Sequence, residues 1–482
     1  MISVQSHRQR LSGNREWTFM FMIFLLMASC TPLKKTPTKK PDIQVVKPDI
    51  PDKKGQETTP PKPQKTDQPS HQKDIVVKDV DTLHLKENTT KTPPIKSKND
   101  KDAVFTEGLD MKSSYHIKLL IPLNSDAGLV QGNQLRFVHF YAGVLKALEV
   151  LDDQRLKFLV DVIDTEEGGY NLRSKIDDIL SDDTDLVIGP FEKDDVKELA
   201  EAAKKKGIPI MSPWQTSTKI ASENPWYVQL KPNLKEHFNK LTQACIYDFH
   251  QGEVAIVGKD NKETRAWIEY FQNTAKNLTN NKKEPFFTSY FVSNDSLINA
   301  PSAFFRLLSN PKIKAVLLPN YSFSDEEFVY GVLRRLMAEK GSKQVVVYGM
   351  PLLIESEKID FDFYHALNLR IALSDYLDLN SEEIREFRRE FLDLYGEIPL
   401  SDAVKGYSIM MLAANSLHSY GTHFQNYIVN KDMTFLQTTY NIEKSVSEDK
   451  ETDINNTKDF DYFENKHLDI VEFKGTGFVK RF

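Results

Sequence analysis

The sequence predicts an α/β protein built from two similar units, each a mainly parallel sheet flanked by helices. Short apolar runs alternate with amphipathic helical patterns through most of residues 114–421, and this alternation occurs twice along the chain. The length of 482 residues also exceeds what one hydrophobic core usually organises. The formal net charge of −6 is small for this size and argues against a general nucleic-acid binder.

The first unit is clearest between Leu156 and Pro232. Three apolar runs, at Phe158–Val162, Leu186–Ile188 and Ile208–Met211, are each followed by a polar or proline-containing turn. Between the last two runs, apolar residues recur at the i, i+3, i+4 and i+7 spacing of a helix with one apolar face. Strands and helices in this order predict a right-handed parallel sheet. Ligands bind beyond the carboxyl ends of such strands, so the three turns are expected to line one wall of a cleft.

The remaining segments repeat this alternation. We predict strands at Tyr115–Pro122, Glu253–Val257, Phe286–Val292, Ala315–Leu318 and Val345–Tyr348, and helices around Phe137–Leu148, Leu234–Phe249, Trp267–Leu278, Phe328–Leu336, Glu383–Tyr395 and Ala403–Leu417. Arg370–Leu373 is interpreted as a segment that crosses back to the first unit. The final residues, from His467, predict an edge hairpin with Gly475 and Gly477 at or near its turn. Cys245 lies within a helical pattern and predicts a small buried thiol.

The stretch from Leu156 to Pro232 resembles the first lobe of type I periplasmic solute-binding proteins, the group that includes the leucine/isoleucine/valine receptors. The features that match are the Asp164 turn, the run Val187-Ile188-Gly189-Pro190 with the helix after it, and Ile208–Pro213 leading to Thr216. Late in the chain, a helix ending in Tyr395-Gly396, then Pro399, then a helix opened by Gly406-Tyr407 is similar to the same family.

The resemblance implies two Rossmann-like lobes with an interlobe cleft and hinge crossovers, preceded by a disordered tether. We therefore expect residues 113–233 and 369–421 in the first lobe, residues 234–368 in the second lobe, and residues 422–482 completing the second lobe with the C-terminal hairpin.

The N-terminal part of the sequence predicts a signal peptide followed by a linker. Arginines, an apolar run from Phe19 to Met27 and then Ala28-Ser29-Cys30 predict a signal peptide over residues 1–29. Its end resembles the bacterial lipobox, in which Cys30 is acylated; an ordinary signal peptide with an incidental cysteine is the alternative. Residues 30–112 are rich in Pro and Lys and poor in apolar residues, which predicts a disordered linker. A lipid anchor implies the cell envelope on its periplasmic side, with the outer membrane favoured because Thr31 follows the cysteine.

No catalytic signature is present, so the sequence predicts a binding protein without enzyme activity, cofactor or metal. HExxH, CxxC, GxSxG and the P-loop pattern are all missing from the 482 residues. The acidic run Asp182, Asp183 and Asp185 predicts a solvated turn and cap.

The candidate ligand-binding residues follow from the family resemblance. They are Ser125, Asp164, Glu192, Lys193, Trp214, Gln215, Thr216 and Tyr321. For Thr216 the alternative is a capping hydroxyl, for Trp214 it is packing against the hinge, and for Tyr321 it is core packing. Glu192 and Lys193 stand where amino-acid receptors carry small hydroxyl residues, and Gly349-Met350-Pro351 replaces the acid that meets an α-amino group. This departure argues against an α-amino-acid ligand.

Two functions remain open from the sequence. The first is a lipid-anchored solute-binding protein that offers a small polar ligand to a transporter permease or a sensor. The second follows from Gly189–Val196 (GPFEKDDV), which resembles the Gly-Pro-Leu-x-Lys-x-x-Val loop of penicillin-binding-protein activator lipoproteins. That resemblance implies a regulator of peptidoglycan synthesis that contacts a peptidoglycan synthase, and the long tether suits it. In both cases the expected partners include the membrane, through Cys30, and exclude nucleic acid.

Overall fold

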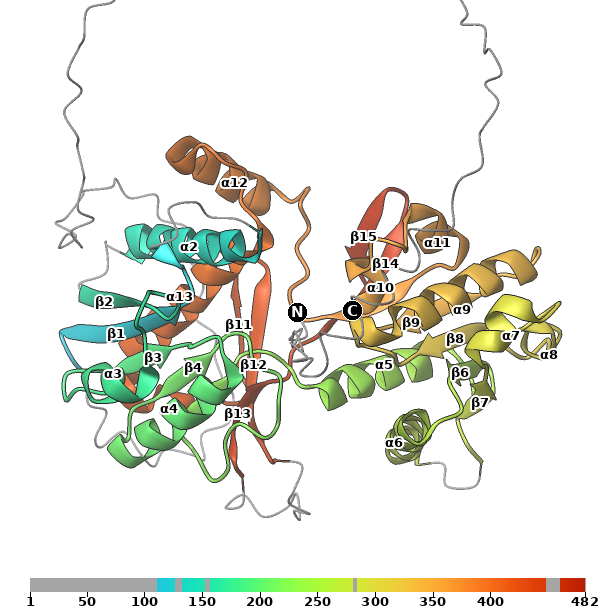
Figure 1. Ribbon diagram of the computed structural model, residues 1–482, viewed down its shortest axis with the longest axis horizontal. Helices are drawn as coiled ribbons and strands as arrows, with labels where there is room; N and C mark the ends of the chain where they lie inside the picture. Colours follow the sequence, from blue (N-terminus) through green and yellow to red (C-terminus); the bar gives the residue numbers. More distant parts are fainter. Residues whose placement is uncertain (1–110, 126–131, 152–156, 281–283, 448–459, 482) are drawn as a thin grey trace, which may run out of the picture. The chain divides into compact units, whose positions relative to one another are not determined.

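The computed structural model describes residues 111–125, 132–151, 157–280, 284–447 and 460–481 (Figure 1). The predicted signal peptide, Cys30 and nearly all of the predicted linker lie outside the described residues. The described chain contains two mixed sheets covered by helices, which confirms the predicted fold class.

The first sheet has eight strands in the order β11-β12-β13-β5-β4-β3-β1-β2. Its strands are β1 (Ser114–Ile121), β2 (Lys157–Asp164), β3 (Leu186–Ile188), β4 (Ile210–Ser212), β5 (Tyr227–Gln229), β11 (Asp432–Phe435), β12 (Thr438–Ser445) and β13 (Tyr462–Asn465). The register pairs Ile117 with Val160 and Ile188 with Met211, both in parallel ladders. The six strands from β13 to β2 are parallel, and β11 and β12 extend the sheet in antiparallel pairing.

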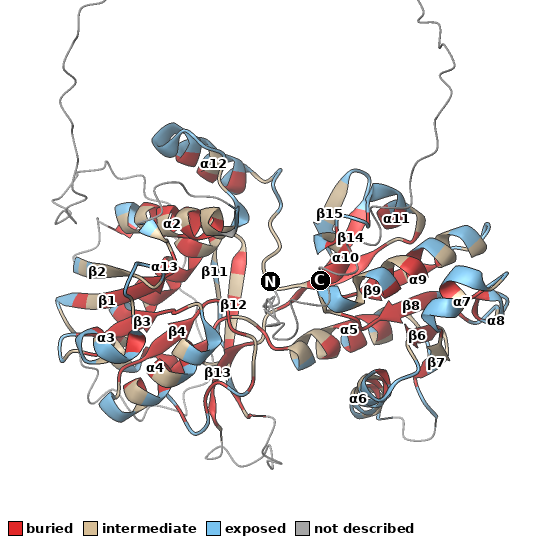
Figure 2. Cartoon of the chain, viewed as in Figure 1, coloured by how far each residue is buried: buried red, intermediate tan, exposed pale blue. Residues whose placement is uncertain are grey.

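Helices cover both faces of this sheet because successive buried residues of each strand point to opposite sides. Ile117 and Leu119 of β1 pack with α2 (Leu135–Leu151) and α13 (Ser401–Tyr420). Leu120 packs with α3 (Leu172–Ile179) and α4 (Lys193–Lys206) on the other face. Figure 2 shows the strands between the helices as buried along most of their length. A sheet buried on both faces explains why the sequence shows continuous apolar runs here.

Two glycines allow α2 and α13 to pack closely. A Cβ on Gly143 would overlap the backbone carbonyl of Ala403, and one on Gly406 would overlap that of Phe140. The two helices therefore meet backbone to backbone, which fixes the start of α13 against the first sheet.

The second sheet has seven strands in the order β15-β14-β10-β9-β8-β6-β7. They are β6 (Val254–Gly258), β7 (Phe287–Phe291), β8 (Ala315–Leu318), β9 (Val346–Gly349), β10 (Arg370–Leu373), β14 (Asp469–Lys474) and β15 (Gly477–Lys480). One face packs on α5 (Leu234–Asp248) and α6 (Lys262–Thr279), where Cys245 is buried as predicted. The other face packs on α7 (Asn294–Asn299), α8 (Phe305–Leu308), α9 (Glu326–Glu339), α10 (Leu352–Glu355) and α11 (Phe361–Ala366).

The remaining elements are α12 (Glu382–Tyr395) and the short 3-10 helices η2 (Gly132–Gln134), η3 (Phe323–Asp325) and η4 (Gly421–Asn426). The C-terminal hairpin is confirmed: β14 and β15 pair antiparallel at the edge of the second sheet, and Gly475 turns between them with φ +62°. Arg481 anchors the hairpin, with contacts of 2.8 Å to Glu472 and 2.5 Å to Asp248 of α5.

The crossovers differ from the sequence prediction in two places. Arg370–Leu373 does not cross between the units; it is β10, a strand of the second sheet held between β9 and β14. The chain leaves that sheet only after Leu373, because Ile371 and Ala372 are fully buried among its neighbours. Residues 422–482 also do not all complete the second unit. Strands β11–β13 extend the first sheet, where Phe463 pairs with Val228, and only β14 and β15 join the second.

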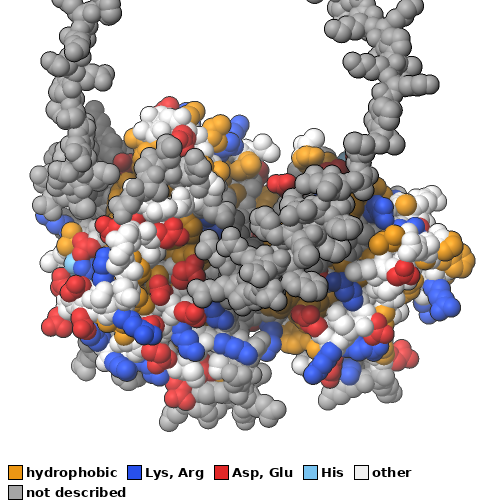
Figure 3. All heavy atoms as spheres, viewed as in Figure 1, with side chains coloured by type: hydrophobic (Ala, Val, Ile, Leu, Met, Phe, Trp, Pro, Cys, Tyr) orange, Lys and Arg blue, Asp and Glu red, His pale blue; other side chains and the backbone are white. Residues whose placement is uncertain are grey.

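Charged side chains are distributed evenly over the surface that can be seen. Figure 3 shows Lys and Arg side chains interspersed with Asp and Glu on the drawn face, in agreement with the small net charge. Within the described ranges we find no helix with the length and apolar character needed to cross a bilayer.

The close approach of α2 and α13 gives a first prediction. Gly143→Ala places a methyl group on the Ala403 carbonyl and should lower the free energy of unfolding by about 1–3 kcal/mol, the usual cost of overpacking. Gly477→Ala is the matched control, since a Cβ there meets open space. Chemical denaturation of both variants measures the difference, and equal stabilities would contradict the packing described here.

Candidate functional site at the crossovers

A cavity of about 320 Å³ lies where loops from both sheets converge. Its lining consists of Thr216, Lys231, Pro232, Leu234, His237, Tyr321, Met350, Pro351, Ile354, Glu355, Leu373, Ser374, Asp375 and Ser401. Most of these residues come directly after a parallel strand. Thr216 follows β4, Lys231 follows β5, Tyr321 follows β8, Met350 follows β9 and Ser374 follows β10. This is the edge at which open α/β sheets bind ligands.

The lining combines an apolar part with a few polar groups. Leu234, Tyr321, Met350, Ile354 and Leu373 supply hydrocarbon and aromatic surface. Tyr321 is held by Trp267 of α6, with ring centroids 5.7 Å apart. Hydroxyls, two carboxylates, an ammonium group and an imidazole supply the polar contacts, a mixture typical of sites for small molecules.

Asp375 is the best-anchored charge of the cavity. Its carboxylate lies 2.5 Å from the ammonium group of Lys405 on α13, and the Ser374 hydroxyl donates to its other oxygen. Burial alone would raise the pKa of Asp375, but the positive charges of Lys405 and Lys231 outweigh it and hold the pKa well below its usual range. The pair joins the crossover after β10 to α13 of the first sheet.

His237, in the first turn of α5, is the cavity's imidazole. Burial and then the charge of Lys231 lower the pKa of His237 to about 4, so the ring is neutral at pH 7. The backbone of Ala372 acts in the opposite direction and favours the protonated form of the ring. Nδ1 of the ring is buried and has no hydrogen-bond partner.

Lys231 and Glu355 are the two lining charges that form no ion pair with another described residue. Lys231 is half-buried on the crossover that follows β5, whereas Glu355 is exposed at the end of α10. Both line the cavity.

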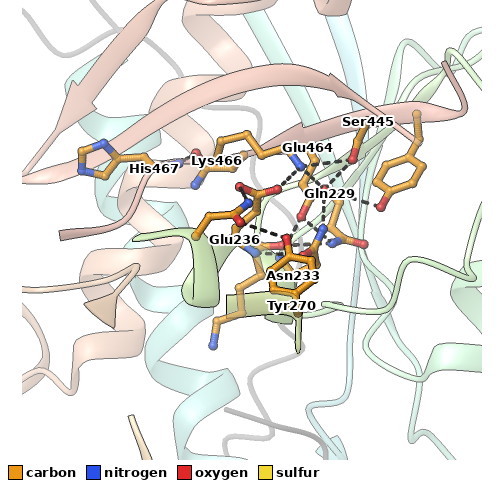
Figure 4. Close-up of polar contacts among 12 residues, drawn as sticks. Gln229, Asn233, Glu236, Tyr270, Ser445, Glu464, Lys466 and His467 are labelled. Carbon is orange, nitrogen blue, oxygen red and sulfur yellow. Dashed lines mark hydrogen bonds and ion pairs between the residues drawn. The ribbon is translucent and has the colours of Figure 1, made fainter. Parts of the chain in front are cut away.

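The crossovers that flank this cavity are joined by a buried carboxylate, drawn in Figure 4. Glu464, at the end of β13, is fully buried. Its oxygens accept hydrogen bonds from the Asn233 backbone N–H at 2.7 Å and from the Asn233 side-chain amide at 3.0 Å. They also accept from Ser445 at 2.8 Å and from Lys466 at 2.7 Å. Asn233 lies on the crossover from β5 to α5, and Lys466 lies on the crossover from β13 to β14.

Lys466 balances the charge of Glu464. Its ammonium group also contacts Glu236 of α5 at 2.9 Å, as Figure 4 shows. Burial would lower the pKa of Lys466, but the two carboxylates outweigh burial and raise it. Asn233 in turn caps α5 by accepting a hydrogen bond from the Glu236 backbone. One network therefore fixes the ends of two crossovers and the start of the helix that carries His237.

Two of the residues predicted from sequence, Thr216 and Tyr321, line the cavity. Asp164 and Ser125 lie together but outside the lining. The Asp164 carboxylate accepts backbone N–H groups from Leu123, Asn124 and Ser125 at 2.8–3.1 Å, and the Ser125 hydroxyl donates to it at 2.8 Å. Asp164 therefore holds the loop after β1 in place.

Trp214 and Gln215 also lie outside the lining and have structural surroundings. Trp214 is only 7% exposed and packs against Phe137, Phe140 and Phe191 with ring centroids 5.0–5.8 Å apart. The Gln215 amide donates to the Phe191 carbonyl at 2.6 Å. Glu192 stands at the N-cap position of α4 and makes no side-chain capping hydrogen bond, Lys193 is the first residue of the helix, and both are exposed. The roles of these residues toward a ligand stay predictions.

Lys231, His237, Asp375 and Lys405 were not among the residues predicted from the sequence. Asp375 could have been predicted as a site residue, because it follows the apolar run that forms β10 and therefore lies beyond the carboxyl end of a strand. His237 sits one position before the apolar Phe238 on a helix, and nothing in that pattern separates a cavity-lining imidazole from a solvated one. Its role depends on the long-range meeting of α5 with β10.

A wider depression of about 810 Å³ lies at the ends of β6 and β7 and includes Lys259, Phe291, Phe305 and Arg306. This depression is open to solvent, and its lining residues all belong to the second sheet, the helices that cover it or the loops between them. The crossover cavity is smaller but is enclosed by loops of both sheets, so we take it as the candidate site. Within the described ranges, no cluster of three or more His, Cys, Asp or Glu residues is placed to hold a metal ion.

Solved structures share this fold at low sequence identity. A branched-chain amino acid ABC transporter protein from Rhodospirillum rubrum matches with a TM-score of 0.55 and 15% identity, over 76% of this chain and 100% of that one. LpoA from Haemophilus influenzae, a regulator of PBP1A, matches with a TM-score of 0.50 and 12% identity, over 77% of this chain and 60% of LpoA. No protein-family model and no curated protein sequence matches the chain. The fold that the sequence resemblance implied is confirmed, and these neighbours are binding proteins and a regulator, not enzymes.

The Glu464 network gives a second prediction. Glu464→Ala leaves the Lys466 charge and the Asn233 donors without their acceptor and should lower the free energy of unfolding by about 3–5 kcal/mol. Glu383→Ala, on the exposed face of α12, is the control and should change stability by about 0.5 kcal/mol or less. Urea denaturation compares the two, and a small loss for Glu464→Ala would contradict a central role for this carboxylate.

Proposed function

We propose that this protein is a lipid-anchored, periplasm-facing binding protein that holds a small polar ligand in the crossover cavity, for transport or sensing. One observation carries the proposal: five loops that follow parallel strands of both sheets converge on one cavity with unpaired polar groups. A ligand there would touch both units and two of the crossovers between them. Its binding energy would thereby act on the relative position of the two units.

The fold shared with a branched-chain amino acid transporter protein supports this proposal, as does the absence of catalytic signatures in the sequence. The polar groups of the cavity are better suited to binding a ligand than to catalysing a reaction on it. The charge of Asp375 is paired with that of Lys405, and among the described residues no side-chain hydroxyl hydrogen-bonds to Nδ1 of His237. We therefore propose that the protein binds its ligand without transforming it.

A second function, regulation of peptidoglycan synthesis through protein contacts, is favoured by a different observation. Phe137, Phe191 and Trp214 fill the loop region of the first sheet where the family resemblance placed polar ligand contacts. Large apolar side chains are also exposed on α12 and just after it, namely Leu392, Leu394, Tyr395, Ile398 and Leu400. LpoA, which shares the fold, is a regulator of PBP1A. Co-purification with a cell-wall synthase, together with no response to any metabolite, would favour this function over ligand transport.

A thermal-shift screen of polar metabolites tests the first function. Saturation by a ligand at 100 times its Kd adds about 2.7 kcal/mol to stability, which raises the melting temperature by several degrees. Thr216→Ala removes a cavity hydroxyl and should weaken binding of the best compound about tenfold. Thr288→Ala, at an exposed position of β7 outside the lining, is the control and should bind normally. If the two variants bind alike, the ligand lies elsewhere.

The membrane anchor is tested separately. In cells labelled with radioactive palmitate the wild-type chain should carry label and sediment with membranes, because several acyl chains anchor a protein essentially permanently. Cys30→Ser should carry no label and appear in the soluble periplasmic fraction, whereas Cys245→Ser should behave as wild type. Label on the Cys30→Ser variant would contradict acylation at this position.

A further inference from the structure

The end of α12 and the connector that follows it expose a run of large apolar side chains. Ile384, Phe387 and Phe391 hold the helix through its buried side, whereas Figure 2 shows most of the rest of α12 as exposed. The exposed apolar residues, each 39–61% accessible, are Leu392, Leu394, Tyr395, Ile398 and Leu400. We call Leu392–Leu400 the α12 surface. A continuous group of this kind is typical of a surface that binds another molecule, unlike apolar residues exposed singly.

Contacts with α2 fix the backbone of the α12 surface. Nδ1 of His139 accepts a hydrogen bond from the Leu400 backbone N–H at 3.2 Å. The Tyr395 hydroxyl donates to the Ala142 carbonyl at 3.4 Å, and its ring centroid lies 4.6 Å from that of the buried Phe391. Binding of a partner would therefore cost little conformational entropy on this side of the contact.

The exposed charges of the α12 surface are negative. Asp393 and Glu397 are exposed among its apolar residues, and the sequence has no Lys or Arg from Glu390 to Asp402. The C-terminus of a helix carries a partial negative charge that favours a cation in the last turn, yet α12 has no basic residue there. The helix α4, by contrast, ends with Lys204, Lys205 and Lys206.

The cations that α2 contributes here are already paired. The ammonium group of Lys146 lies 2.5 Å from Glu390 and is buried, and the Arg136 guanidinium lies 3.3 Å from Asp402. Asp393 forms no ion pair with another described residue. The end of α12 therefore keeps a negative charge that a binding partner can match.

This charge decides between the candidate occupants of the surface. Segments that lie on an anionic bilayer carry Lys and Arg beside their apolar residues, whereas the α12 surface carries carboxylates. A second copy of the chain that met the same surface across a two-fold axis would bring carboxylates against carboxylates. A protein segment with apolar and basic side chains avoids both costs and supplies a cation at the helix C-terminus.

We propose that the α12 surface binds a segment of another protein that combines apolar side chains with Lys or Arg. The apolar side chains of that segment would cover Leu394 and Ile398, and its cations would meet Asp393 and Glu397. The inference rests on the second proposed function, regulation through protein contacts, for which it names the surface and the chemistry of the partner. It does not depend on the crossover cavity.

Photo-crosslinking of the full-length protein, in the cells that make it, tests this proposal. The photoreactive residue p-benzoylphenylalanine replaces Leu394 in one variant and Ile398 in another. Ile298 and Phe361, which are 70% and 64% exposed on other elements, are the control positions. After irradiation, mass spectrometry identifies the peptides that are joined to each position.

Both positions of the α12 surface should crosslink to the same segment of one partner protein. That segment should contain apolar residues together with Lys or Arg, and the control positions should not reach it. The proposal is overturned if neither position crosslinks, or if the crosslinks join lipid, this chain itself, a second copy of it, or a segment without Lys or Arg.

A charge reversal shows whether the carboxylates contribute to the contact. Asp393→Lys, introduced into the Ile398 crosslinking variant, should lower the crosslinking yield about tenfold, because it sets a cation against the cations of the partner. Glu201→Lys, at an exposed position of α4, changes the net charge equally and should leave the yield as it was. An unchanged yield with Asp393→Lys overturns the proposal even where a partner is captured.

The outcomes separate this inference from the second function. If a cell-wall synthase co-purifies with the protein but crosslinks only at other positions, the inference fails and the second function stands. If the α12 surface crosslinks to a basic segment of a protein that has no part in cell-wall synthesis, the inference stands and the second function fails.

Discussion

The structure depends on one buried carboxylate. Glu464 ends a strand of the first sheet, and its oxygens hold Asn233 on one crossover and Lys466 on another. An unpaired carboxylate at this depth would be strongly unfavourable, so the network is stable only while both crossovers keep their positions. The third crossover, after β10, is tied to α13 by the Asp375–Lys405 pair. The cavity thus lies among segments that are fixed by charge pairing and not by apolar packing alone.

This arrangement suits the proposed ligand-binding function. Polar networks at crossovers specify one geometry, whereas the apolar cores of each sheet, with Ile117 in one and Val316 in the other, remain separate clusters. A ligand bound at Lys231 and His237 would contact the crossover after β5 and the first turn of α5 directly. The aromatic cluster around Trp214 fills the space between the loops after β3 and β4, and of the candidate residues in those loops Thr216 lines the cavity. The proposed binding is therefore concentrated at the crossovers and on the second sheet's side.

The fold was predictable because its strands are buried on both faces, which produces continuous apolar runs such as Leu186–Ile188 and Ala315–Leu318. The crossover positions could not be predicted from the sequence, because β10 and β13 are short strands that can be identified only from the strands they pair with. Of the candidate site, the sequence located Thr216 and Tyr321, which follow clear strands. It assigned Trp214 and Asp164 to the ligand, but their surroundings are a packed aromatic cluster and a loop of backbone N–H groups. Lys231, His237 and Asp375 come together only through contacts between distant segments.

Amide hydrogen exchange, measured by mass spectrometry with and without a bound compound, shows whether a ligand is recognised at the crossovers. If it is, exchange should slow in the segments around Lys231–His237 and Leu373–Asp375 when ligand is present, with little change in α6 or α12. Binding that leaves these segments unchanged, or that protects only the depression around Phe305 and Arg306, would contradict recognition at the crossovers.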